Sequence, residues 1–389
     1  MKKAVLVSCF NYYDNRLKFV EEQLIKKGYE VFYIYSDFDH IKKKKLTSYI
    51  KKENHIILNV PKYIKNFSFK RILSHFIFSR KVYAELKEKS PELVYCMIPP
   101  NFLSYYVMKY KKNDKKNKII FDIYDLWPES FPVKNNKYLI DKLIRPWGLI
   151  RDFSLESADY IVTECDYYQS ILKFKKEDNV NTLHLMKTET DIEKKEILRQ
   201  LNSEKTTLDY DQINVAYLGS LNNIIDIEKI IFTLKSLNTK RKVRFNLIGT
   251  GETKEQLLNK LSEIGIEYVD YGIVYDFESK KRILQECDFG INMMKDSVTV
   301  GLTMKSIEYF QFGLPLLNNI KGDSQKIVLE EAVGFNITEN NMENIINDIC
   351  NLSLDDLIEM KKKSRRVYEN YFSYEAFSKK LNWILKDIQ

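Results

Sequence analysis

The sequence contains few of the residues that brace a chain through disulfides or metal ions. Only five cysteines and four histidines occur among 389 residues. The cysteines are scattered at Cys9, Cys96, Cys165, Cys287 and Cys350. Neither a CxxC nor an HExxH pattern occurs, so the sequence favours neither a disulfide framework nor a metal site. We therefore expect no metal ion, no cofactor and a reducing, cytoplasmic compartment.

Long apolar runs are missing as well. The N-terminus passes from Met1, Lys2 and Lys3 into a short apolar run at residues 4–7, which is too short for a signal-peptide core. No run is long enough to form a membrane-spanning helix. We expect a cytoplasmic protein, either soluble or peripheral at the inner face of the plasma membrane.

The excess of one charge sign is small. Lysine and arginine number 62 against 54 acidic residues, which gives a net charge of +8 spread along the chain. Without a recognition motif, this balance does not favour a nucleic-acid partner.

The length of the chain and its alternating pattern predict two domains. A chain of 389 residues exceeds what one hydrophobic core usually holds. Short apolar runs alternate with helical patterns in two series, which predicts an α/β fold with two Rossmann-like, doubly wound parallel sheets. Strands are expected at residues 5–8, 31–34, 93–96, 119–122, 160–163 and 183–185, and then at 215–218, 245–248, 268–270, 289–292 and 316–318. The predicted parts are domains 1–187 and 213–372, a linker 188–212 and a C-terminal helix 373–389.

Residues 301–315 form the most informative stretch of the sequence. A glycine-marked loop leads into a short helix that ends at Gly313. The unpaired N–H groups and positive dipole at the start of such a helix suit a diphosphate. Lys305 and Glu308 share one face of this helix, so the lysine can meet the phosphates while the carboxylate holds a ribose. Taken alone, the pair is more often an ordinary surface ion pair.

Several neighbouring motifs resemble those of GT-B-fold glycosyltransferases. The Lys-x-x-Glu-Tyr sequence at residues 305–309 and the Gly-x-Pro sequence at 313–315 resemble the donor-site signature of this class. The resemblance implies two Rossmann-like domains that face a cleft, with the acceptor bound by the first and the nucleotide sugar by the second. It also implies that the last helix crosses back to the first domain.

Three glycines follow strands of the second series, namely Gly219, Gly249 and Gly251. Ligands bind at such strand ends in doubly wound sheets, although each glycine alone is more often a structural turn. The resemblance assigns the donor site by segment. Ile273 and Val274 would meet the base, Glu308 the ribose, the amides of Gly301, Leu302 and Thr303 the diphosphate, and Asp296 and Ser297 the sugar. Lys305 would stabilise the leaving diphosphate as a catalytic residue.

Residues 122–130 carry three carboxylates directly after a predicted strand: Asp122, Asp125 and Glu129. One of them could act as a base toward an acceptor hydroxyl or bind sugar hydroxyls, and Trp127 could stack on a sugar ring. Alternatively, Asp125 caps a helix and Trp127 packs against it. The Asp-Leu-Trp-Pro-Glu sequence resembles family-four (glycosyl transferases group 1) enzymes of bacterial surface polysaccharides. That resemblance implies a role in capsule or cell-surface polysaccharide biosynthesis, with Asp125 catalytic and Asp122, Trp127 and Glu129 binding the acceptor.

The sequence departs from that family at several positions. Val300 stands eight residues before Glu308, where many retaining members have a glutamate, and Gly219 is followed by no arginine. The loop after the first strand lacks the usual glycines, and its Asn11, Asp14 and Arg16 are candidates for acceptor binding. A GT-B-fold UDP-sugar epimerase and a catalytically degenerate nucleotide-sugar-binding protein remain alternatives.

Residues 62–81 interleave basic and aromatic side chains and contain no acid. Such a face suits anionic lipid headgroups, and the acceptor could then be a saccharide or a polyprenyl-linked saccharide. The alternative is an ordinary helix with a solvated basic side.

Overall fold

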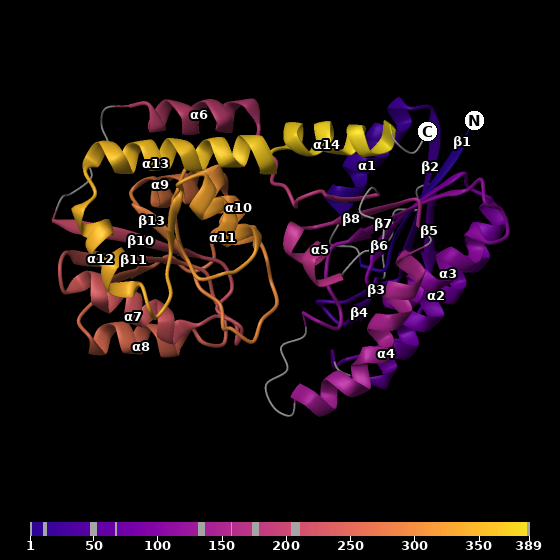
Figure 1. Ribbon diagram of the computed structural model, residues 1–389, viewed down its shortest axis with the longest axis horizontal. Helices are drawn as coiled ribbons and strands as arrows, with labels where there is room; N and C mark the ends of the chain where they lie inside the picture. Colours follow the sequence, from indigo (N-terminus) through magenta and orange to yellow (C-terminus); the bar gives the residue numbers. More distant parts are fainter. Residues whose placement is uncertain are drawn as a thin grey trace. The chain divides into compact units, whose positions relative to one another are not determined.

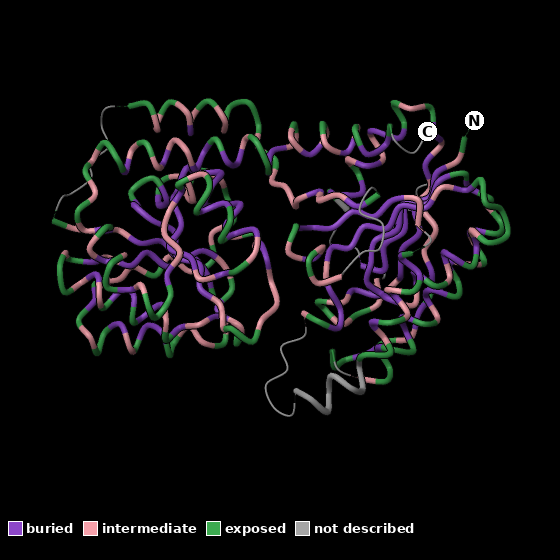
Figure 2. Tube along the Cα trace, in the orientation of Figure 1, coloured by how far each residue is buried: buried purple, intermediate pink, exposed green. Residues whose placement is uncertain are grey.

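The computed structural model describes residues 2–10, 14–46, 53–66, 68–130, 137–156, 158–172, 179–203 and 211–386. The chain forms two compact units, drawn in Figure 1. The first holds Met1–His184 together with Ser378–Gln389, and the second holds Leu185–Phe377. Each unit has its own parallel sheet, and Figure 2 shows buried chain running through the middle of each.

The sheet of the first unit has seven parallel strands in the order β5-β2-β1-β6-β7-β8-β9. Their bounds are β1 (Lys2–Ser8), β2 (Tyr29–Ser36), β5 (His55–Leu58), β6 (Leu93–Ile98), β7 (Lys118–Ile123), β8 (Tyr160–Thr163) and β9 (Val180–Thr182). All six residues of β6 are buried, as expected for a parallel strand covered on both faces. A separate antiparallel pair joins β3 (Phe38–Asp39) and β4 (Lys44–Lys45).

Helices cover both faces of this sheet. The helices are α1 (Asp14–Lys26), α2 (Phe69–Lys89), α3 (Asn101–Lys111), α4 (Lys137–Leu155) and α5 (Asp166–Leu172). Helices α2, α3 and α4 pack side by side (Figure 1). The last helix, α14 (Tyr374–Lys386), belongs to this unit from Ser378 onward. Its Asn382 Nδ2 donates to Gln23 Oε1 of α1 at 2.9 Å, and Lys380 Nζ donates to Asn181 Oδ1 at 2.9 Å.

The sheet of the second unit has six parallel strands in the order β12-β11-β10-β13-β14-β15. Their bounds are β10 (Gln212–Leu218), β11 (Lys242–Ile248), β12 (Glu267–Asp270), β13 (Phe289–Asn292), β14 (Leu316–Asn318) and β15 (Gly334–Asn336). The helices are α6 (Asp191–Leu201), α7 (Ile227–Asn238), α8 (Lys254–Glu263), α9 (Phe277–Gln285), α10 (Met304–Gln311), α11 (Asp323–Glu330), α12 (Met342–Asn351) and α13 (Leu354–Val367), followed by a π-helical turn, η2 (Tyr368–Phe372).

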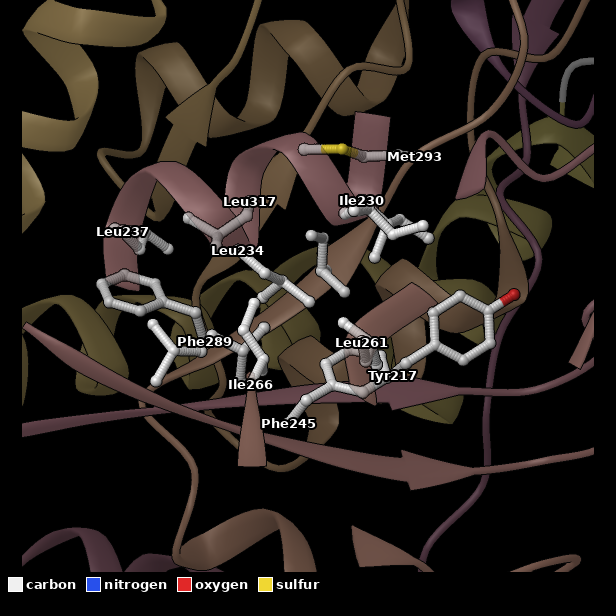
Figure 3. Close-up of a cluster of buried hydrophobic side chains, with 14 of the residues drawn as sticks. Tyr217, Ile230, Leu234, Leu237, Phe245, Leu261, Ile266, Phe289, Met293 and Leu317 are labelled. Atoms are coloured by element: carbon white, nitrogen blue, oxygen red, sulfur yellow. The ribbon is translucent and has the colours of Figure 1, made fainter. Parts of the chain in front are cut away.

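One core of this unit lies between the sheet and the helices α7, α8 and α12 (Figure 3). Helix α7 contributes Ile230, Leu234 and Leu237, whose spacing of three or four residues places them on one face. They pack with strand residues such as Phe245 and Phe289, all of them buried. The apolar periodicity of α7 therefore fixes which side of the helix meets the sheet.

A tyrosine of α10 joins the other side of the sheet at the point where the strand order reverses. Tyr309 Oη accepts a hydrogen bond from Leu218 N of β10 at 2.7 Å and lies 3.2 Å from Ala216 O. Its ring packs directly on Gly290 of β13, because a Cβ built on that glycine would lie 2.6 Å from the ring. This contact fixes the position of α10 above the gap between β10 and β13.

Ten of the eleven predicted strands are present, and the sequence missed four short ones. All five strands predicted in the second series occur, and so do the first five of the first series. The strand predicted at residues 183–185 lies at Val180–Thr182 instead, although Leu183 N still donates to Thr163 O at 2.9 Å. The predicted linker contains α6, whose N-terminus is closed by a capping box between Thr190 and Glu193. The short strands β3, β4, β5 and β15 were not predicted. No helix in the described ranges is long and apolar enough to cross a membrane.

We expect Tyr309→Phe to destabilise the second unit by about 1–3 kcal/mol, because the buried N–H of Leu218 loses its acceptor. Chemical denaturation monitored by circular dichroism measures this change. Tyr371→Phe is the matched control, since that hydroxyl donates to Glu331 Oε1 at an exposed position. Equal stability of both variants and the parent would contradict the structural role of Tyr309.

Candidate functional site

The first turn of α10 is fixed by a small hydrogen-bond network. Thr303 is the N-cap, and its Oγ1 accepts from Ser306 N at 3.2 Å. Asn292 Nδ2, at the end of β13, donates to Thr303 Oγ1 at 2.6 Å and to Ser306 Oγ at 2.9 Å. The preceding Gly301 and Leu302 are buried, and Gly301 O accepts from Ser324 N at 2.8 Å. These contacts hold the amides of the helix start in place.

Lys305 lies in this turn and has little to balance its charge. Its Nζ donates to Tyr217 Oη at 2.5 Å and lies 4.0 Å from the centre of the Tyr217 ring. No carboxylate of the described residues lies within ion-pairing distance of it. Burial lowers the pKa of Lys305 to about 7. The site thus holds a cation that an anionic ligand would stabilise. Figure 3 shows the Tyr217 hydroxyl turned away from the apolar core.

The three predicted glycines bring the neighbouring loops together beside Lys305. A Cβ on Gly219, whose φ is +111°, would lie 3.4 Å from Lys305 Cε. A Cβ on Gly249 would lie 2.0 Å from Gly219 O, and one on Gly251 would lie 2.3 Å from Leu221 O. Gly249 and Gly251 therefore serve loop-to-loop packing, and Gly219 lies against the lysine. This position at the carboxyl ends of β10 and β11 is where doubly wound sheets bind ligands.

Glu308 follows one turn later and is held between two lysines. Its Oε1 accepts from Lys187 Nζ at 2.7 Å and from Lys280 Nζ at 2.6 Å. Burial lowers the pKa of Lys187, and the Glu308 charge partly opposes this shift. The predicted ribose-binding carboxylate is therefore already paired, and a ribose would have to share or replace these contacts.

The remaining predicted donor residues lie on separate loops of the second unit. Ile273 is exposed and Val274 partly buried in the loop after β12. Asp296 and Ser297 are exposed, and Asp296 Oδ2 pairs with Lys229 Nζ at 2.9 Å. Asp296 also lines a cavity of about 330 Å³ at the ends of β14 and β15, together with Lys229, Asn318, Asn319, Ile320, Lys321, Gln325, Asn336, Ile337, Thr338, Glu339 and Asn340. Its predicted contact with the donor sugar stays a prediction.

In the first unit, Arg16 and Asp122 form a buried pair. Arg16 Nε donates to Asp122 Oδ2 at 2.6 Å, and Nη2 donates to Oδ1 at 3.0 Å. Tyr95 Oη also donates to Asp122 Oδ2 at 2.6 Å, and Arg16 reaches the carbonyls of Leu183 and His184. Asp122 is fully buried. The pair thus joins α1, β7 and the segment after β9, and both side chains have a structural task in place of the predicted exposure to an acceptor.

The other residues of the 122–130 turn differ in their surroundings. Burial raises the pKa of Asp125, whose Oδ1 accepts from Ser130 Oγ at 2.6 Å. A raised pKa makes this carboxylate a stronger base. Glu129 is bound by the buried Arg151 through two contacts of 2.8 and 2.9 Å. Trp127 is only 8% exposed and packs against Arg71 and His75, which agrees with the alternative packing role. Its stacking on a sugar ring stays a prediction.

Two of the acceptor candidates are not fully described by the structure. Asn11 lies outside the described residues, and so does the side chain of Asp14, the first residue of α1. Within residues 62–81, Tyr63, Arg71 and His75 are buried, whereas the surface carries the other bases. The segment is therefore a domain helix with one buried polar side and one exposed face. In the described residues, no group of histidine, cysteine and acidic side chains is arranged to hold a metal ion.

Sequence reasoning missed three residues of the second unit. Tyr217 binds Lys305, and Lys187 and Lys280 bind Glu308. A tyrosine near the carboxyl end of a buried apolar strand is a weak signal for Tyr217. Nothing in the sequence relates either lysine to a glutamate on another helix.

The sequence matches no protein-family model and no curated protein. Solved structures do match over nearly the whole chain. Sucrose-phosphate synthase from Thermosynechococcus elongatus has a TM-score of 0.69 at 13% identity, covering 100% of this chain and 99% of its own. The lipopolysaccharide outer core galactosyltransferase WaaB has a TM-score of 0.65 at 13% identity, covering 100% of both chains. HepE from Anabaena, solved in complex with UDP, has a TM-score of 0.64 at 12% identity, covering 99% of this chain and 100% of its own. The chain has the GT-B fold, as predicted.

We expect Lys305→Met to stabilise the protein at pH 6 by a few kcal/mol, at about 1.4 kcal/mol for each unit of pKa shift. An unfolded lysine titrates near about 10.4. With the folded pKa below that value, the unfolded chain binds the extra proton between about pH 7 and pH 10. Stability of the parent therefore rises with pH in this window, and its difference from the variant shrinks.

Denaturant unfolding at pH 6, 8 and 10 measures this difference. Lys235→Met is the control, because Lys235 is exposed on α7. A Lys305→Met difference that stays constant across this range would contradict a buried, uncompensated lysine.

Proposed function

We propose that this protein is a glycosyltransferase that moves a sugar from a nucleotide-diphosphate-sugar to a saccharide or polyprenyl-linked acceptor in cell-surface polysaccharide biosynthesis. One observation carries the proposal: Lys305 is a buried cation without a carboxylate partner among the described residues, on the first turn of α10. A diphosphate would supply the missing negative charge. The fold supports this choice, and HepE, which shares it, was solved with UDP and with UDP-glucose.

The proposed reaction uses the charge of this turn on the leaving group. The bond between the sugar C1 and the diphosphate oxygen breaks, and the bond between C1 and the acceptor oxygen forms. Lys305 and the amides at the start of α10 stabilise the negative charge that grows on the diphosphate. Glu308 accepts the ribose hydroxyls, and Asp125 takes the proton of the acceptor hydroxyl.

We expect Lys305→Met to lower kcat by about 100–1000-fold, the usual cost of removing one group that stabilises transition-state charge. Glu308→Gln should weaken nucleotide binding by about tenfold, because a neutral amide accepts hydroxyl donors less strongly. A thermal-shift screen with UDP, GDP, dTDP and CMP and their sugar conjugates identifies the donor first. Calorimetry and turnover assays on the variants follow.

Lys235→Met is again the control and should bind and turn over like the parent. Nucleotide binding without turnover on any acceptor would favour a binding protein, an outcome that Val300 at the position of the usual glutamate makes informative. No shift with any nucleotide, or normal turnover in folded Lys305→Met, would contradict the proposed site.

We further propose that α2 rests on an anionic membrane. Phe69, which is 90% exposed, shares one stripe of the helix with Leu73 and Phe76. Lys62 and Lys65 precede the helix, Lys70 follows Phe69, and Arg80 lies four residues after Phe76; all four bases are exposed. An apolar stripe bordered by bases suits insertion among anionic headgroups.

We expect the protein to bind phosphatidylglycerol vesicles at low salt, with binding that falls as salt rises. The double change Phe69→Ser and Leu73→Ser should weaken binding on the order of tenfold through loss of buried apolar area. Vesicle co-sedimentation measures both effects. Phe232→Ser, at an exposed position of α7 in the second unit, is the matched control. Absence of binding at low salt would remove the membrane from the proposal.

A further inference from the structure

A second uncompensated cation lies in the first unit. Arg71, near the start of α2, is 4% exposed. Its Nη1 donates to Asn66 O at 3.0 Å, and its guanidinium lies 4.1 Å from the centre of a Trp127 ring. Its Nε is buried and has no hydrogen-bond partner among the described residues. No carboxylate of the described chain forms a salt bridge with it, in contrast to the buried Arg16, Arg151 and Arg365.

The surroundings of Arg71 supply aromatic faces and neutral imidazoles, and the Asp125 carboxylate acts on its charge without forming a salt bridge. We define the Arg71 cluster as Phe10, His40, Tyr63, Arg71, His75 and Trp127. His75 stacks on Trp127 with ring centres 5.8 Å apart, and neither of its ring nitrogens has a hydrogen-bond partner within the described ranges. His40 Nδ1 lies 2.5 Å from Tyr63 Oη. Burial and the nearby Arg71 charge lower the pKa of both histidines, that of His40 to about 3. Both are therefore neutral, and neither balances the positive charge of Arg71.

The cluster lies where the sheet of this unit would bind a ligand. Phe10 follows β1, His40 follows β3, and Trp127 follows β7. The strand order reverses at β1, where β2 lies on one side and β6 on the other. Ligands of open parallel sheets bind outside the carboxyl ends of the strands at such a reversal. The Arg71 charge also acts on Asp125, the proposed base, without pairing with it.

A buried charge without a partner is costly, and natural chains keep such a group chiefly where it has a task. A packing role does not need an arginine here, because an apolar side chain would fill the same space against Trp127. An arginine suits the recognition of a phosphate or carboxylate, since its planar fork donates two parallel hydrogen bonds. The guanidinium donates to the carbonyl of the exposed Asn66, and its Nε keeps a donor without a partner among the described residues.

We propose that the Arg71 cluster binds an oxyanion, a phosphate or carboxylate group, with Arg71 as the charged donor and His75 as a second donor. The identification of this group as part of the acceptor rests on the proposed function; the binding itself does not. The acceptor would then be acidic, and its anionic group would anchor it near Asp125.

The test measures thermal shifts with anions in a Lys305→Met background, so that the second unit cannot account for phosphate binding. Glucose 6-phosphate, glucuronate and neutral glucose are compared at equal ionic strength in this background and with Arg71→Met or Arg80→Met added. We expect at least one anion to raise the melting temperature by several degrees, glucose to have no effect, and Arg71→Met to abolish the shift. Arg80→Met, at an exposed position of the same helix, should retain it. The anion that raises the melting temperature more shows whether the site prefers a phosphate or a carboxylate.

A second readout separates binding from structure. Without ligand, Arg71→Met should melt at the same temperature as its background or higher, because the uncompensated charge is gone. Arg71→Lys keeps the charge but not the fork, and we expect it to retain a reduced shift. An unchanged anion shift in Arg71→Met, no shift in the background, or an equal response to glucose would overturn the proposal. UDP binding by the parent protein is measured separately, so each of the two proposals, the donor site and the Arg71 site, can be contradicted without the other.

Discussion

The hydroxyl of Tyr309 lies where the neighbouring strands β10 and β13 of the second sheet diverge, and the candidate donor site depends on this contact. At this reversal β10 and β13 share only a short ladder, so the N–H of Leu218 needs another acceptor, which Tyr309 provides at 2.7 Å. The ring fits only because Gly290 has no side chain. Helix α10 is thereby fixed directly over the strand ends. Since Lys305 and Glu308 lie on the same helix, four residues and one residue before Tyr309, this hydrogen bond and the missing Cβ help to fix where the lysine and the carboxylate lie.

The two units place unbalanced positive charge in comparable positions by different means. Lys305 faces a phenol in the second unit, and Arg71 faces an indole and neutral imidazoles in the first. In each case the neighbours are π-rich groups that tolerate a cation without neutralising it. Other buried cations are paired with a carboxylate, as with Arg365, which binds Glu189 at 2.5 Å. The buried Lys361 instead donates to the Cys287 carbonyl at 2.6 Å. Lys305 and Arg71 differ from these residues because both lie near carboxyl ends of strands, where a ligand could supply negative charge.

Much of the fold could be predicted from the sequence because it depends on local patterns. Buried parallel strands such as β6 and β10 are continuous apolar runs, and α10 is marked by its cap at Thr303 and its end at Gly313. The strand β15 gives no such pattern, because its three residues are only partly buried and phenylalanine stands between glycine and asparagine. The site was harder to predict, because its side chains find partners far along the chain. Arg16 and Asp122 are 106 residues apart, and Lys187 lies more than a hundred residues before Glu308. Spacing within one segment carries no information about such pairs.

The pairing of Glu308 gives the candidate site a property that its motif alone does not. Two lysines share one carboxylate oxygen, so the charges around Glu308 sum to a positive value before any ligand arrives. These contacts hold the Glu308 side chain in one orientation, which lowers the entropy lost when hydroxyls bind to it. They also leave one lysine in excess, close to the helix that carries Lys305. A nucleotide diphosphate would thus meet an oriented carboxylate that can accept hydrogen bonds from the ribose hydroxyls, with positive charge close by. A neutral nucleoside would bind less well here, because it offers the ribose hydroxyls but no negative charge to pair with the second lysine.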